Sequence, residues 1–136
     1  MLFKRSKLTT TDIGRFGESA AEQFLKKNGY RILAKNFRAG RNELDIVAED
    51  RDFLVFVEVK ARSNVGLYET DYGSPSSAVT HAKRKRTIEA ARAYLCKNPT
   101  EKAPRFDVIE VYLKQTDFAA RPEVLKIEHL CDAFRN

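Results

Sequence analysis

Residues 43–62 decide the fold of this chain and read ELDIVAEDRDFLVFVEVKAR. Two strand-like runs, 43–49 and 53–61, are separated by the three polar residues 50–52, and so short a connection is typical of an antiparallel hairpin. The second run is apolar on both faces until Glu58, which indicates a central strand of a sheet.

Charged residues lie not only at the turn of this hairpin but also on its strands away from the turn. With a two-residue turn, Asp45 lies opposite Glu58 and Glu43 lies opposite Lys60, and alternation places Glu58 and Lys60 on one face. Two carboxylates that face each other across strands destabilise a sheet unless a positive charge lies between them. A divalent cation, Mg²⁺ or Mn²⁺, is the natural candidate, and Lys60 would then reach a water or phosphate oxygen beside it. The alternative is a surface Glu–Lys pair, which the apolar run before Glu58 disfavours.

The flanking segments predict two helices and further strands. The expected elements, in chain order, are a flexible basic arm (1–9), a helix begun by Thr10 or Thr11 and ended near Asn28 by Gly29, a strand (30–37), the two hairpin strands, a long polar loop (62–76), a helix (Ser77–Lys97) and strands at 106–113 and 124–130. This order, αβββαβ(β), indicates one α/β domain over residues 10–136 with a mixed sheet. Glu18 falls at the margin of the first helix's apolar face, and Gly17 beside it suggests a close approach by another element.

Length and composition exclude several classes of protein. The chain has 136 residues, 43% hydrophobic and 32% charged, which excludes a disordered chain and a membrane protein and fits one domain. No apolar run approaches the roughly 18 residues of a spanning helix, and no apolar region of a secretory signal follows the basic N-terminus. Cys96 and Cys131 have neither pairing nor metal-site spacing, so we expect reduced, semi-buried thiols in a cytoplasmic protein.

The net charge of +6 is unevenly distributed along the chain. Residues 1–41 carry a net +7, residues 42–82 a net −5, residues 83–105 a net +6 and residues 106–136 a net −2. An acidic segment between two basic ones fits a metal-dependent enzyme acting on nucleic acid, because basic surfaces attract phosphate backbones. The alternative is a solvated surface with uneven charge.

Six basic residues are candidates for contacts with a nucleic-acid backbone. Arg38, Arg41 and Arg62 flank the hairpin, and Lys83, Arg84 and Arg86 lie in the second helix. Such contacts position a substrate without reading its sequence. Lys83 lies within the apolar stripe of its helix, so we expect its ammonium group to reach towards the sheet and the acids. The alternative for this basic run is a solvated helix face.

Several motifs resemble the YraN-like family of uncharacterised bacterial proteins. They are GRFGESAA (14–21), ELDIV (43–47), LVFVEVKAR (54–62), VTHAK (79–83), AARAYL (90–95), FDV (106–108) and HLCDAF (129–134). That family is similar to archaeal Holliday-junction resolvases of the PD-(D/E)XK nuclease superfamily. The resemblance implies a three-layer α/β/α, restriction-endonuclease-like domain with a central mixed sheet.

The resemblance also assigns roles to residues. It implies Asp45 and Glu58 as metal ligands, Lys60 as the catalytic lysine and Glu18 as the acidic member carried by the helix. The implied activity is a Mg²⁺- or Mn²⁺-dependent endonuclease that hydrolyses phosphodiester bonds in DNA, with branched, Holliday-junction-like or single-stranded DNA as expected substrates and a homodimer as the expected assembly. Two alternatives remain: a nucleic-acid-binding module that keeps the fold without cutting, and an interaction scaffold that uses the basic helix.

Overall fold

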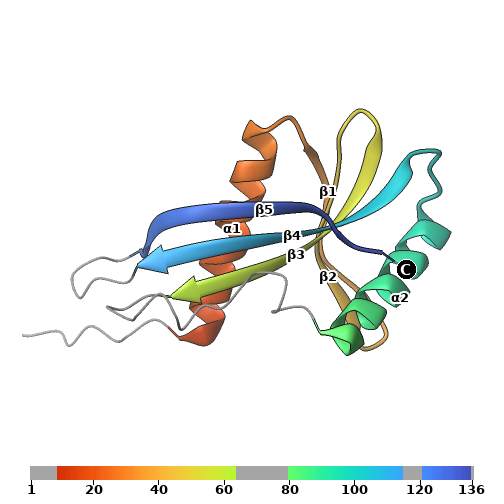
Figure 1. The fold of residues 1–136 in the computed structure, drawn as a ribbon. Coiled ribbons are helices and arrows are strands. Elements are labelled where there is room, and N and C mark those ends of the chain that lie inside the picture. The colour runs from red at the N-terminus through yellow and green to blue at the C-terminus, as the bar shows by residue number, and fades with distance from the viewer. Residues whose placement is uncertain (1–8, 64–79, 115–120, 136) are drawn as a thin grey trace, which may run out of the picture.

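The computed structural model describes residues 9–63, 80–114 and 121–135, in which two helices pack on a five-stranded sheet (Figure 1). The elements are α1 (Thr10–Lys27), β1 (Arg31–Ala39), β2 (Asn42–Glu49), β3 (Phe53–Ser63), α2 (His81–Lys97), β4 (Ala103–Lys114) and β5 (Glu123–Phe134). The predicted order αβββαβ(β) is therefore confirmed. Most of the expected arm and of the expected loop lie outside the described residues.

The sheet is mixed and follows chain order, β1-β2-β3-β4-β5. Strands β3 and β4 are parallel, and the other neighbours are antiparallel. Helix α2 lies between the two parallel strands in the chain, as a parallel connection requires. The hairpin has the predicted register, with Ile46 opposite Val57, and β3 is the central strand, as its apolar sequence predicted.

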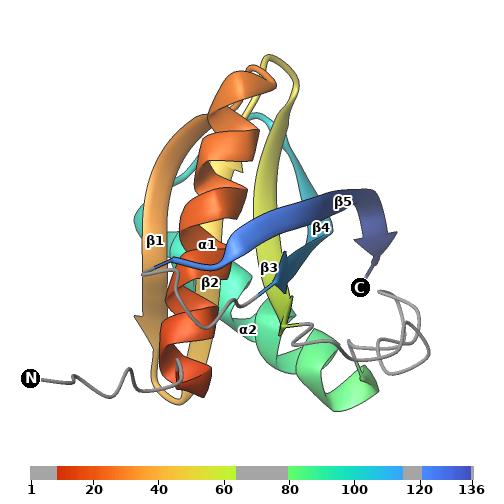
Figure 2. The same cartoon turned by 90° about the vertical axis from the view of Figure 1, so that its left-hand side faces the viewer.

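One helix covers each face of the sheet, which confirms the three-layer α/β/α architecture (Figure 2). Ala21 and Leu25 of α1 pack on a core that includes Ile46 and Val57. On the opposite face, α2 packs its own apolar residues on the sheet, and Phe56 belongs to that second core. Alternation along the hairpin strands thus supplies both cores at once.

The helix ends differ in detail from the expectation. Thr9, not Thr10 or Thr11, caps α1, because its hydroxyl accepts from the Asp12 N–H at 3.1 Å while the Asp12 carboxylate accepts from the Thr9 N–H at 3.1 Å. Helix α2 begins at His81, after Thr80 as its N-cap, rather than at Ser77.

Two further findings concern membrane crossing and the cysteines. Neither α1 nor α2 combines the length and apolar character that crossing a membrane would require. Both cysteines, Cys96 and Cys131, are free, and both are exposed rather than semi-buried as expected.

Candidate active site

The candidate site forms where β2 and β3 part. Pairing of the two strands starts beside their turn and runs to Ile46 and Val57. At the next position Asp45 directs its carboxylate towards β3, and Asp45 Oδ2 accepts a hydrogen bond from the Val59 backbone N–H at 2.8 Å. A side chain therefore takes the place of a backbone partner at the point of separation.

A change in backbone conformation accompanies this separation. Asn36 of β1 has a φ of 52° and, by the register of β1 with β2, lies across from Asp45. Leu44 packs in the core beneath α2, whereas Ile46 packs in the core beneath α1. Residues two apart on a regular strand share a face, so β2 rotates at Asp45.

Glu58 is the most deeply buried acid of the site, with 4% of its surface exposed. Its Oε1 lies 3.2 Å from the Nζ of Lys83 on α2 and 3.6 Å from the Nζ of Lys60 on β3. The alternative of a Glu58–Lys60 pair on the surface is thus excluded. The prediction that the Lys83 ammonium group reaches the acids is confirmed.

The surroundings of Asp45 raise the pKa of its carboxyl and so disfavour its charged form. The pKa of its carboxyl is raised from an ordinary 3.8 to about 7, because burial disfavours the charged form and the Glu58 and Glu18 carboxylates lie near. The Val59 N–H and the Lys83 ammonium group act in the opposite direction on this pKa and do not overcome the burial.

Helix α1 brings Glu18 to the same place. Gly17 packs directly on β3, where an added Cβ would lie 2.5 Å from the Cβ of Ala61, and this is the close approach that the glycine suggested. Burial raises the pKa of the Glu18 carboxyl, and the Glu43 and Glu58 carboxylates raise it further. Glu18 is therefore in electrostatic contact with the acids of the hairpin.

Glu43 is a fourth acid that sequence reasoning did not assign to the site. With its amide nitrogen turned towards the acids, Asn36 donates to Glu18 Oε1 at 3.0 Å and to Glu43 Oε1 at 3.1 Å. Arg38 lies 3.7 Å from Glu43 on its other side. The predicted pairings of Asp45 with Glu58 and of Glu43 with Lys60 are both absent, because the register of β2 with β3 ends at Ile46 and Val57 and the strands have parted beyond that level.

The donor set fits a hard divalent cation. The site holds four carboxylates against two ammonium groups, which leaves a net charge of −2 when all six are ionised: Glu18, Glu43, Asp45 and Glu58, with Lys60 and Lys83. Oxygen ligands suit Mg²⁺ and Mn²⁺, and Mg²⁺ usually keeps several waters and binds one or two carboxylates. Asp45 and Glu58 would hold such an ion, and Glu18 would reach it through water.

Three of the six candidate residues for nucleic-acid contacts, Arg38, Arg41 and Arg86, are exposed. Arg38 and Arg41 belong to the end of β1 and the turn into β2, and Arg86 lies in the second turn of α2. Figure 2 shows the β1–β2 turn and the starts of both helices at the same end of the molecule. These side chains are placed to track a phosphate backbone past the acids, and that role stays a prediction.

Two other candidates, Arg62 and Arg84, are held by side chains of the sheet. Arg62 Nε donates to Glu110 Oε1 at 2.6 Å, and Glu110 is fully buried. Arg84 places its guanidinium carbon 5.6 Å from the centre of the Phe134 ring. Glu110 was missed by sequence reasoning, although a glutamate within the apolar run 106–113 was a usable signal.

A second polar cluster lies between β4 and β5. Among the described residues, one set of three metal-ligand atoms lies within 4.8 Å of one another, from Asp107, His129 and Cys131, and the acids around Asp45 do not form such a set. The Asp107 carboxylate accepts from Arg105 Nε and Nη2 at 2.9 and 2.8 Å and from the Asp132 N–H at 2.9 Å, and its Oδ2 lies 2.7 Å from His129 Nε2. Because these groups already occupy Asp107, the cluster joins β4 to β5 rather than offering a metal site.

Comparison with known proteins identifies relatives. The family model described as "Uncharacterised protein family UPF0102" matches residues 17–111. A UPF0102 protein of Prosthecochloris aestuarii is 44% identical over 124 residues, covering 90% of this chain and 93% of the relative. UPF0102 proteins of Chlorobium phaeobacteroides and Acetivibrio thermocellus are 46% and 47% identical, over 90% and 75% of this chain and 94% and 76% of their own lengths. These matches confirm the resemblance drawn from the motifs.

Proposed function

Because this chain belongs to the UPF0102 family, whose description states no reaction, we propose its function from the candidate site: a Mg²⁺- or Mn²⁺-dependent endonuclease that hydrolyses phosphodiester bonds in DNA. One observation carries the proposal. Glu58, Asp45 and Glu18 come from three different elements and interact where β2 and β3 part, and the raised pKa of Asp45 marks negative charge that a divalent cation would compensate.

The residues of the chain divide the work of hydrolysis among them. A bound divalent cation would polarise the phosphoryl group and lower the pKa of a bound water. Asp45 and Glu58 would hold that ion, while Glu18 orders water on the α1 side. Lys60, whose ammonium lies 3.6 Å from Glu58 Oε1, would orient the attacking water and stabilise negative charge that develops on the phosphoryl oxygens.

The proposed partner is DNA, with branched, Holliday-junction-like or single-stranded forms as the substrates to test first. Basic side chains near the acids favour a polyanion, and contacts to phosphate do not depend on base sequence. A homodimer would supply two such sites for paired cuts in a junction, and we include it in the proposal.

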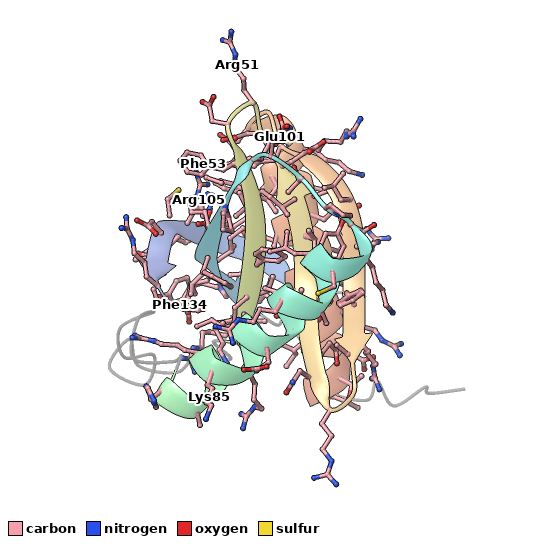
Figure 3. The ribbon with its side chains drawn as sticks, turned by 90° about the vertical axis from the view of Figure 1, so that its right-hand side faces the viewer. Arg51, Phe53, Lys85, Glu101, Arg105 and Phe134 are labelled. Atoms are coloured by element: carbon pink, nitrogen blue, oxygen red, sulfur yellow. The ribbon has the colours of Figure 1, made fainter. Side chains whose placement is uncertain are left out.

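Cleavage assays with matched variants test this function. We expect the wild-type chain to cut labelled junction, flap, single-stranded or linear DNA with Mg²⁺ or Mn²⁺, and Asp45→Asn to lower the rate by about a thousandfold or more, because it removes a cation ligand. Glu101→Gln serves as the control and should cut normally. It removes an exposed carboxylate at the end of the molecule opposite Lys85 (Figure 3). Full activity of Asp45→Asn would remove Asp45 from the scheme.

A non-cleaving nucleic-acid-binding module is the second candidate, and one observation favours it. Both lysines already lie beside Glu58 Oε1, so the charge of Glu58 is compensated without a metal. Titration of Mn²⁺ into the wild type and Glu58→Gln separates the two functions. Binding that is lost in Glu58→Gln favours the endonuclease, and the absence of Mn²⁺ binding in both chains favours the binding module.

A further inference from the structure

We propose that Lys83 is the counter-ion of Glu58 in the substrate-free protein and leaves it for a substrate phosphate, so that cation binding and DNA binding reinforce each other. This inference rests on the proposed function and adds the coupling between its two ligands. It assigns Lys83 a positioning role in which one ammonium group has two alternative partners.

The two lysines at Glu58 are carried by different elements. Lys60 lies on the same strand as Glu58, two residues further on, so its backbone stays beside the carboxylate. Lys83 comes from the first turn of α2, in the helix layer that packs on the sheet, and meets the same Oε1 at 3.2 Å; its side chain is 32% exposed and that of Lys60 is 28% exposed. A long side chain with a solvent-exposed portion can change partner by rotating about its own bonds, without moving the helix.

The ammonium group and a cation compete for one oxygen. Glu58 is 4% exposed, so few groups can approach its carboxylate, and Lys83 is the closer of the two ammonium groups there. A divalent cation at Asp45 and Glu58 would repel Lys83, because like charges at short range in a buried site interact strongly. A phosphodiester at the cation would at the same moment offer Lys83 a new anionic partner.

Reciprocal coupling follows from this exchange. If DNA draws Lys83 away from Glu58, DNA raises the affinity for the cation, and by linkage the cation raises the affinity for DNA by the same factor. A purely structural ion pair between Lys83 and Glu58 would give no such coupling, because removal of the Lys83 charge would then change the cation affinity by the same factor with and without DNA.

The chain offers a matched control on the same helix. Lys85 lies two residues after Lys83 and is exposed, and Figure 3 shows it on the outer side of α2. Lys83→Met and Lys85→Met remove the same charge from the same element and keep an unbranched side chain. Any difference between the two variants therefore reports the position of Lys83 next to Glu58.

Calorimetric titration of Mn²⁺ without DNA is the first test. We expect Lys83→Met to bind Mn²⁺ about tenfold more tightly than the wild type and Lys85→Met to bind as the wild type does. Equal or weaker binding by Lys83→Met would overturn the inference while leaving the proposed function standing. If neither the wild type nor Lys83→Met binds Mn²⁺, the proposed function fails and the inference fails with it.

The affinity for DNA, measured with and without a cation, is the second test. Fluorescence anisotropy of a labelled four-way junction, with Ca²⁺ to avoid cleavage, gives the factor by which the cation strengthens binding. We expect that factor to be about tenfold larger in the wild type and in Lys85→Met than in Lys83→Met, where only the direct contact between the cation and the phosphate remains. The same factor in all three chains would contradict an exchange of partners by Lys83.

Discussion

At Asp45, burial and neighbouring acids make ionisation costly to the folded state. The pKa of the carboxyl is about 7 in the folded chain, against roughly 3.9 for an unfolded aspartate, so the folded state loses stability as pH rises from the lower value through the higher one. Asp45→Asn removes this loss and keeps an acceptor for the Val59 N–H. We therefore expect the free energy of unfolding of Asp45→Asn, relative to that of the wild type, to increase by about 2 kcal/mol as the pH rises from about 5 to about 8.

Urea denaturation at both pH values measures this gain. Glu101→Gln, which removes an exposed carboxylate far from the site, is the control for the loss of one acid. If the difference in free energy of unfolding between Asp45→Asn and the wild type stays constant with pH, ionisation of Asp45 does not destabilise the folded state. Adding Mg²⁺ should restore part of the stability of the wild type at the higher pH, since binding to the folded state stabilises it.

The acids differ in how far the sequence predicts them. Asp45, Glu58 and Glu18 could be placed because strand alternation and the helical period act over short distances. Glu43 was placed opposite Lys60, because alternation assumes that pairing continues to the end of the strand. The structure breaks that assumption where Asn36 adopts a left-handed conformation, which its sequence signals only weakly.

Helix α1 contains one glycine packed tightly against β3, Gly17, and one with open space around it, Gly14. An added Cβ at Gly17 would meet Ala61 at 2.5 Å, whereas one at Gly14 would have nothing within 4 Å. We expect Gly17→Ala to destabilise the fold by about 2 kcal/mol, because overpacking outweighs a gain in helix propensity of about 1 kcal/mol. Gly14→Ala should stabilise the fold by up to about 1 kcal/mol.

Chemical denaturation of the two variants measures these free energies. Because α1 carries Glu18, Gly17→Ala should also weaken Mn²⁺ binding, while Gly14→Ala should not. Stabilisation of similar size in both variants would show that α1 does not rest on β3 as closely as the structure indicates.

The ends of the elements were harder to predict than their existence. Thr9, Thr10 and Thr11 can all cap a helix, and the reciprocal bond with Asp12 selects Thr9. Arg105 lies only two residues from Asp107, whereas the contacts of Asp107 with His129 and Asp132 could not be predicted, because those residues lie more than 20 positions further along the chain. Short periodic patterns carry no information about which strands become neighbours.

On the scale of the whole molecule, charge is expected to determine how DNA is held. Arg41 and Arg86 are exposed at the end where both helices begin, and Figure 3 shows Arg51 at the opposite end from Lys85. We expect the double variant Arg41→Ala/Arg86→Ala to weaken binding alike across DNA sequences and to reduce the slope of log K against log salt by about 2.

Anisotropy titrations at several salt concentrations give this slope. Arg51→Ala should leave it unchanged, because Arg51 lies in the β2–β3 turn, away from the acids. A slope that falls equally in both variants would mean that DNA is held by overall charge and not by the end that carries the acids.

The order of the strands in the sheet determines which parts of the molecule can fold first during synthesis. Among the strands in the described part of the chain, each pairs with its neighbour in sequence, and only β3 with β4 brings together residues as distant as Phe53 and Ala103. Closing that long loop is expected to be the slow event in folding, after the local meander β1–β3 has formed. During synthesis the carboxylates Glu18, Glu43, Asp45 and Glu58 thus leave the ribosome before Lys83, and the nascent meander carries its negative charge before that ammonium group arrives.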